Sequence, residues 1–132
     1  MEDKICLDTD FLVNFLRNKA DEVQFIKDFE NSKKLATTHI NLFELYFGAY
    51  KSKDREKSLI SVNELSERLT IIGLSKSSAM KAGKTLASLE KQGKLIDFRD
   101  LLIGTIAEDS GYSVKTGNVK HFSLIGGLKV LD

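Results

Sequence analysis

The chain has 132 residues, which is a usual length for one domain that buries its own hydrophobic core. Hydrophobic residues make up 42% and charged residues 30%, so the composition is that of a globular protein and excludes a disordered one. The net charge of +1, the single cysteine and the two histidines exclude a uniformly basic nucleic-acid coat, an internal disulfide, a multi-cysteine metal site and a histidine cage.

Short apolar runs alternate with segments of helical periodicity along the whole chain. In chain order they predict strand 5–7, helices 10–17 and 21–29, strand 35–38, helices 41–49 and 54–69, strand 70–74, helices 77–92 and 99–109, and strands 113–116 and 128–131. Gly93 follows one predicted helix as a C′ glycine. This alternation predicts an α/β three-layer sandwich around a short, central, mostly parallel sheet, in a single domain over residues 1–132.

The chain shows no signal that directs it to a membrane. Its longest apolar runs cover only a few residues, too few for a transmembrane helix. The first residues lack the pattern of a signal peptide. We therefore expect a cytoplasmic protein without a membrane partner.

Acidic and amide side chains recur where predicted strands end or helices begin. Asp8 and Asp10 close the first strand, and Glu44 lies one turn into the helix after the second strand. Asp100 begins the helix over 99–109, and Asn118 follows the strand over 113–116. Because ligand sites in parallel sheets lie outside the carboxyl ends of the strands, we expect these side chains to converge.

A cluster of carboxylates favours chemistry with hard divalent cations. Mg²⁺ and Mn²⁺ prefer carboxylate and water oxygens, and a bound cation removes the repulsion between ionised acids. Such cations also activate water and stabilise the oxygens of a phosphoryl displacement. The sequence offers neither a set of residues for a nucleophilic triad nor a glycine-rich phosphate loop, which leaves metal-assisted hydrolysis as the best interpretation.

Structural roles remain open for each of these residues. Asp8 and Asp10 could cap the following helix. Glu44 follows Asn41 by three residues, and taken alone a capping box is its better interpretation. Asp100 is stabilised by the helix dipole near a helix start, whatever its function. Asn118 could be a turn residue after Gly117. A packing or surface role is the better interpretation of His121.

Four segments resemble the motifs of PIN-domain nucleases. They are Leu7-Asp8-Thr9-Asp10-Phe11-Leu12, Thr38-His39-Ile40-Asn41-Leu42-Phe43-Glu44-Leu45, Asp100-Leu101-Leu102-Ile103-Gly104-Thr105-Ile106-Ala107 and Thr116-Gly117-Asn118-Val119-Lys120-His121-Phe122, followed by Ile125-Gly126-Gly127-Leu128. Four motifs in this order cover essentially the whole chain. The group they resemble most is the VapC-like toxins of bacterial and archaeal toxin–antitoxin pairs.

This resemblance implies an endoribonuclease that depends on Mg²⁺ or Mn²⁺. It implies that Asp8, Glu44 and Asp100 are the core catalytic acids and metal ligands. Asn118 stands where the family often has a fourth acid, so a second cation should bind more weakly. In-line attack by water would leave a 5′-phosphate and a 3′-hydroxyl. Secondary candidates at the same edge are Asp97, Asp10 and Thr116.

Basic residues provide two candidate contacts with RNA. Arg99, Lys115 and Lys120 flank the proposed site. Residues 76–94 carry five lysines and one glutamate, and this basic helix could contact phosphates or could simply be a solvated face. The five lysines are Lys76, Lys81, Lys84, Lys91 and Lys94.

The helix after the second strand predicts a protein partner. Its apolar and aromatic residues surround the helix, which a helix with one buried face does not require. They are Phe43, Leu45, Tyr46, Phe47 and Tyr50. The family resemblance implies a homodimer held inactive by a small antitoxin that covers the acidic site with a basic side chain; packing within the monomer is the alternative.

Three other functions compete with a nuclease. A haloacid-dehalogenase-type phosphatase also begins with Asp-x-Asp, but Leu12 stands where that family has Thr or Val. A receiver domain needs an acceptor aspartate after its third strand, where this chain has Ser75-Lys76-Ser77. A catalytically weak PIN-like module that binds RNA or protein is conceivable because of Asn118.

Overall fold

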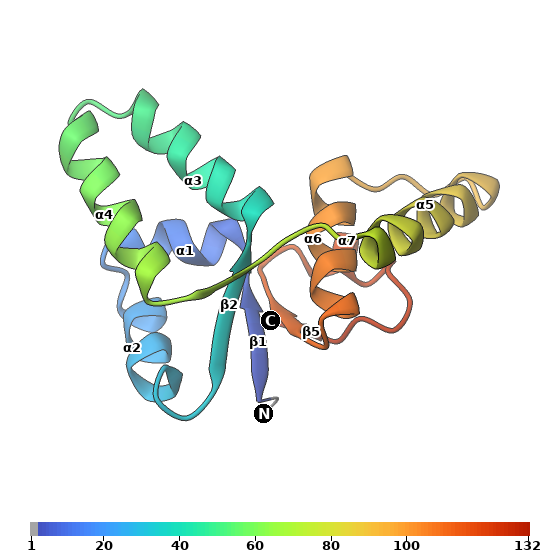
Figure 1. The fold of residues 1–132 in the computed structure, drawn as a ribbon, viewed down its shortest axis with the longest axis horizontal. Helices are drawn as coiled ribbons and strands as arrows, with labels where there is room; N and C mark the ends of the chain where they lie inside the picture. Colours follow the sequence, from blue (N-terminus) through green and yellow to red (C-terminus); the bar gives the residue numbers. More distant parts are fainter. Residues whose placement is uncertain (1–2) are drawn as a thin grey trace.

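A five-stranded parallel sheet lies between two groups of helices in the computed structural model, which describes residues 3–132 (Figure 1). The strand order is β3-β2-β1-β4-β5, and every neighbouring pair is parallel. The strands are β1 (Lys4–Leu7), β2 (Lys34–Thr38), β3 (Thr70–Ile72), β4 (Ser113–Lys115) and β5 (Val130–Leu131). The expected α/β class with a mostly parallel sheet is confirmed.

In residues 3–132, helices α1–α4 lie on one side of the sheet and α6 and α7 on the other, while α5 packs against α6 and extends away from the sheet (Figure 1). The helices on the first side are α1 (Thr9–Leu16), α2 (Ala20–Phe29), α3 (His39–Lys51) and α4 (Arg55–Glu67). The remaining helices are α5 (Lys76–Lys91), α6 (Phe98–Asp109) and α7 (Val119–Phe122). None of the helices in residues 3–132 has the length and apolar character needed to cross a membrane.

The central strand β1 divides two hydrophobic cores. Ile5 and Leu7 pack with residues of α1–α4, whereas Cys6 packs with residues of α6 and α7. All three side chains are fully buried. Because successive strand residues point to opposite faces, this short apolar run supplies both cores and fixes β1 at the centre.

Polar side chains cap the starts of three helices, and a glycine follows the end of one. Asp8 caps α1, Asp97 caps α6, and Ser75 forms a capping box with Ser78 at α5. Gly93 has a φ of +70° just after α5, which confirms the predicted C′ glycine.

Several elements differ from the sequence-based prediction. Helix α3 begins at His39, two residues before the predicted start at Asn41, because Thr38 is its N-cap. The predicted strands 70–74 and 128–131 are shorter, since only the residues beside a hydrogen-bonded neighbour are extended as strand. The short helix α7 was not predicted, because four residues show no periodicity.

Candidate active site

Asp8 lies at the carboxyl end of β1 and begins helix α1. The residue is buried, with 7% of its surface exposed. The Thr116 hydroxyl donates to its Oδ2 at 2.7 Å, while the Asn41 amide and the Thr9 backbone N–H donate to its Oδ1 at 3.0 and 2.8 Å. Groups from three separate parts of the chain therefore fix this carboxylate in one orientation.

Burial raises the pKa of the Asp8 carboxyl to about 6. Hydrogen bonds from Thr116 and Thr9 lower this pKa in part, and the nearby carboxylates of Asp10 and Asp100 raise it further. A buried carboxylate beside two other acids is least stable in its ionised form. A cation at this position would stabilise that ionised form.

Asp10 connects the start of α1 to the loop after β4. Its Oδ2 accepts a hydrogen bond from the Gly117 backbone N–H at 3.0 Å. A Cβ atom on residue 117 would lie 2.8 Å from the same oxygen, so a larger residue there would require the Asp10 carboxylate to move. In the same loop, the backbone N–H of Asn118 donates to the Thr116 hydroxyl at 2.9 Å.

Asp100 lies in the first turn of α6 and faces α7. Its Oδ2 accepts a hydrogen bond from the Asn118 amide at 2.8 Å and lies 3.0 Å from His121 Nδ1. Asn118 has no capping bond with α7, so its side chain is used for this contact. The sequence indicated only a packing or surface role for His121, and the structure adds its contact with the acid.

Glu44 lies one turn into α3 and is not part of a capping box, so that interpretation of the sequence is wrong. Asn41 forms the box instead, in reciprocal hydrogen bonds with Thr38. The Thr9 hydroxyl donates to Glu44 Oε1 at 2.9 Å, and Arg99 Nη1 lies 3.4 Å from Oε2. Glu44 is therefore joined to the start of α1 and to the start of α6.

Asp97 acts as the cap of α6. Its Oδ1 accepts from the backbone N–H groups of Arg99 and Asp100 at 2.9 and 3.3 Å. The same oxygen lies 3.7 Å from the guanidinium Nε of Arg99. The structure thus gives this acid a structural role at the edge of the site.

The three basic residues predicted to contact RNA lie in different surroundings. Arg99 lies between Glu44 and Asp97, at the site. Lys115 lines a small pocket beside Asp10 and Thr116, where its Nζ donates to the backbone carbonyl of Asp132 and lies 5.5 Å from the centre of the Phe25 ring. Lys120 is exposed on α7, beside the residues that contact Asp100.

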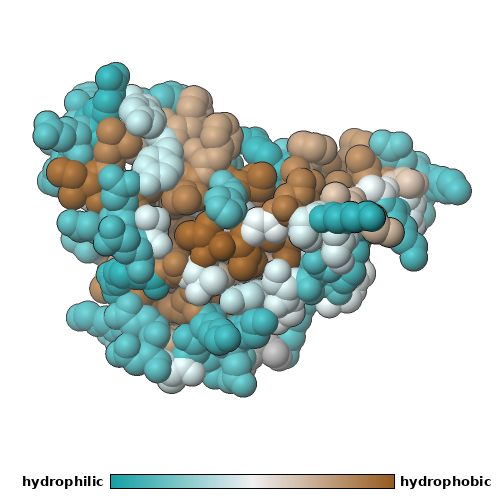
Figure 2. Space-filling view, in the orientation of Figure 1, coloured by the Kyte–Doolittle hydropathy of each residue, from teal (hydrophilic) through white to brown (hydrophobic). Residues whose placement is uncertain are grey.

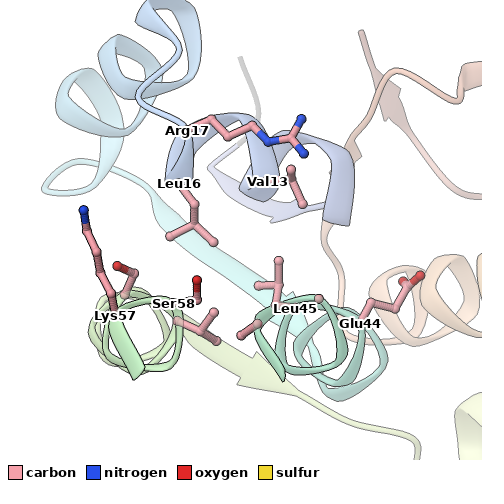
Figure 3. A pocket seen from close by; sticks show the side chains of 11 residues that line it. Val13, Leu16, Arg17, Glu44, Leu45, Lys57 and Ser58 are labelled. Atoms are coloured by element: carbon pink, nitrogen blue, oxygen red, sulfur yellow. The ribbon is translucent and has the colours of Figure 1, made fainter. Parts of the chain in front are cut away.

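A cavity of about 460 Å³ lies next to Glu44, between α1, α3 and α4. Figure 3 shows Val13 and Leu16 of α1 pointing toward Leu45 of α3, so that the floor of the cavity is apolar. Glu44 and Lys57 lie at opposite ends of the cavity (Figure 3). An occupant of this cavity would reach one of the candidate acids.

The side chains at this site fit a hard divalent cation by the chemistry of their donors. Asp8, Glu44 and Asp100 offer carboxylate oxygens, and hard cations select such ligands. Burial is the main cause of the raised pKa of Asp8, and the carboxylates of Asp10 and Asp100 add to it, so a bound cation would favour the ionised form. In the described part of the chain, however, no three Asp, Glu, His or Cys side chains already converge as a metal-binding group. Each acid is held by its own hydrogen-bond donors.

Comparison with known proteins places this geometry in a family. The PIN domain model matches residues 5–123. Ribonuclease VapC2 of Haemophilus influenzae is 29% identical over 126 residues, which are 96% of this chain and 95% of that protein. The tRNA(fMet)-specific endonuclease VapC of Shigella flexneri is 28% identical over 129 residues, 98% of this chain and 97% of that protein.

Solved structures show the same arrangement of the chain. The complex of VapBC2 from Rickettsia felis with a DNA fragment from its promoter contains a chain with a TM-score of 0.88 and 27% identity, and the match covers 96% of both chains. A chain of the DNA-bound VapBC complex from Salmonella typhimurium gives a TM-score of 0.88 at 28% identity, and the match covers 98% of this chain and 97% of that one. The resemblance found in the four sequence motifs is therefore confirmed, and this chain belongs to the PIN domain family.

Proposed function

We propose that this chain is an endoribonuclease that uses a divalent cation, Mg²⁺ or Mn²⁺, to hydrolyse RNA phosphodiesters, and that it is the toxin of a toxin–antitoxin pair. The observation that carries the proposal is the buried Asp8 at the carboxyl edge of the sheet, with Asp10 and Asp100 close enough to raise its pKa. The ribonuclease names of relatives that match nearly the whole chain support the same activity. An RNA substrate would place this activity in the cytoplasm.

The cation would be held by Asp8, Glu44 and Asp100. Thr116 and Asn41 fix the Asp8 carboxylate, so that one ligand is in place before any cation arrives. Asn118 and His121 both contact Oδ2 of Asp100, which leaves its other oxygen available.

When bound, the cation supplies charge neutralisation at the phosphate and lowers the pKa of coordinated water. Arg99 has a side chain that is 58% exposed and lies beside the acids, so its guanidinium can bind a phosphate oxygen of the substrate. Water attacks the phosphorus in line, the bond from phosphorus to the 3′-oxygen breaks, and that oxygen takes up a proton. The products are a 5′-phosphate and a 3′-hydroxyl.

Protein partners would use two surfaces of the α1–α4 side. The apolar cavity beside Glu44 provides a docking surface for an antitoxin segment whose basic side chain reaches the acids. Phe43, Phe47 and Tyr50 of α3 are more than half exposed, and Figure 2 shows apolar surface over this part of the molecule. A second copy of the chain would cover these aromatic rings. The structural relatives are themselves VapBC complexes, which supports an antitoxin partner.

Cleavage of a mixed RNA substrate tests the activity. The purified chain should cleave RNA in Mg²⁺ or Mn²⁺, lose activity in EDTA and regain it when the cation is restored. Asp100→Asn should lose activity under every condition. Asp28→Asn is the matched control, because Asp28 is exposed on α2 and contacts only Gln24 among the described partners.

The outcomes separate the competing functions. Cleavage that survives both EDTA and Asp100→Asn contradicts the proposed site. A folded chain that binds RNA and cleaves none in either cation is the RNA-binding module. A covalent phosphate on Asp8 would indicate an aspartate-dependent phosphohydrolase.

A further inference from the structure

A second groove lies on the α5–α7 side and is not used by the proposed chemistry. Its volume is about 540 Å³, and it runs between α5, α6 and the turn after α7. Polar side chains that line it include Lys84, Thr85, Ser88, Gln92, Lys94 and Ser123. No aromatic residue is among the lining residues, so the groove offers contacts for a polar backbone and no stacking surface for bases.

The charge of this groove is positive. Lys81 neutralises the only acid in its lining, since it pairs with Glu108 and lies 3.8 Å from Asp109. Within residues 3–132, neither Lys84 nor Lys94 forms an ion pair, so both ammonium groups are available to a ligand. Beyond the groove, α5 also carries exposed lysines at Lys76 and Lys91.

Two helices carry residues of both the groove and the candidate active site. Helix α6 carries Asp100 in its first turn and Thr105 in the lining of the groove, about 7.5 Å further along the helix axis. Helix α7 carries His121 beside Asp100 and leads directly to Ser123 in the groove. The groove and the acidic site therefore lie on neighbouring parts of α6 and α7.

We propose that this groove binds backbone phosphates of the substrate RNA strand beyond the scissile bond, with Lys84 and Lys94 as the principal contacts. This inference rests on the proposed function. Lysine ammonium groups attract phosphates without reading sequence, and hydroxyl and amide groups contact the sugar–phosphate backbone. The groove would bind the part of the RNA strand beyond the scissile bond, while cleavage takes place at the acids.

Binding of RNA to a catalytically inactive protein tests this groove. The probe is a fluorescein-labelled oligouridylate, and the protein is the Asp8→Asn chain in EDTA. The double variant Lys84→Gln/Lys94→Gln removes two cations from the groove, and Lys19→Gln/Lys27→Gln removes two exposed cations near and on α2. Each phosphate contact contributes about 0.7 to the slope of the logarithm of the binding constant against the logarithm of the salt concentration. Loss of two contacts in the groove variant should therefore lower this slope by about 1.4 and raise the Kd about 25-fold at about 0.1 M salt.

The control variant should leave both quantities nearly unchanged. Equal weakening by the two variants, or an unchanged Kd in the groove variant, overturns the proposal, and so does an oligouridylate that fails to bind the Asp8→Asn chain at low salt. Polyglutamate is the competing ligand: if the groove variant loses polyglutamate binding and keeps RNA binding, the groove takes an acidic protein segment instead.

A second measurement keeps this inference separate from the nuclease proposal. With Asp8 intact and cation present, the groove variant and the unmodified chain should cleave a dinucleotide at the same rate. The KM of the groove variant should be raised only for longer RNA. Absence of cleavage by every chain contradicts the nuclease proposal and leaves the binding result standing. An equal loss of cleavage activity on the dinucleotide and on longer RNA contradicts RNA binding in the groove.

Discussion

The candidate site consists of two regions that differ in burial and in the way they are held. Asp8 belongs to the sheet, is almost fully buried and receives hydrogen bonds from Thr116 and Asn41, which are buried as well. Glu44 and Arg99 belong to helix starts, and their side chains are 23% and 58% exposed. The buried region is therefore preorganised at a cost in stability, whereas the exposed region can exchange its partners for substrate or cation.

Asp8→Asn gives the largest effect expected from this difference. Activity should fall by about 10³-fold or more, because the proposed metal ligand would provide several kcal/mol of stabilisation through the cation. The free energy of unfolding in EDTA should rise, because the variant removes a buried charge that the fold holds at a raised pKa. Cleavage assays and urea denaturation at pH 7 measure the two effects. A variant that is inactive and also less stable would contradict the conclusion that the fold holds the ionised Asp8 carboxylate at a cost in stability.

The pH dependence of stability sharpens the same contrast. The pKa of Asp8 is raised from 3.8 to about 6 in the folded chain, so between these values the folded state holds more protons than the unfolded state. The contribution of Asp8 to the free energy of unfolding should therefore fall as the pH rises from about 4 to about 7, by at most about 3 kcal/mol. Urea titrations in EDTA at several pH values measure the slope. The Asp8→Asn chain should lack this component, and an identical slope in both chains would refute it.

Replacement of His121 probes the contact that supports Asp100. His121→Ala should lower Mn²⁺ affinity and activity by about 10–100-fold, as the loss of a partner to a metal ligand usually does. His121→Asn should recover most of the loss, because an amide can donate where Nδ1 lies 3.0 Å from the carboxylate. Mn²⁺ affinity is read from the dependence of the melting temperature on Mn²⁺ concentration. Equal defects in both variants would indicate that the ring only packs against its surroundings.

The smallest effect is expected at the exposed region. Arg99→Gln should change the free energy of unfolding by less than about 0.5 kcal/mol, since its ion pairs with Glu44 and Asp97 are solvent-exposed. The KM for RNA should rise about fivefold at about 0.1 M salt, the value of one phosphate contact, and this rise should disappear near 1 M salt. A fall in stability without a change in KM would assign Arg99 to the fold.

The sequence predicted well where Asp8 and Thr116 lie in the fold. Asp8 and Thr116 directly follow β1 and β4, and parallel strands bring their carboxyl ends to one edge whatever the details of packing. The acid at the start of α6 was predicted from the start of a helical pattern. These features depend only on local periodicity and on the topology of the sheet.

Side-chain direction was harder to predict. Glu44 follows Asn41 with capping-box spacing, yet the box is formed by Thr38 with Asn41, because α3 begins two residues earlier than predicted. Lys115 is the last residue of β4 and Thr116 follows it, yet Thr116 contacts Asp8 whereas Lys115 contacts Asp132. The contacts of His121 depend on how α7 packs against α6, for which the sequence carries no local signal.

The hydrogen bond between Thr116 and Asp8 joins residues 108 positions apart, and β4, which leads to Thr116, is a direct neighbour of β1. On the ribosome, the chain is made from its amino terminus, and domains fold as their parts become available. A nascent chain that has not yet reached residue 113 lacks β4, the threonine that holds Asp8, and both side chains that hold Asp100. The cell that makes this protein is thus exposed to a complete acidic centre only when translation is nearly finished, and interrupted synthesis yields fragments without one.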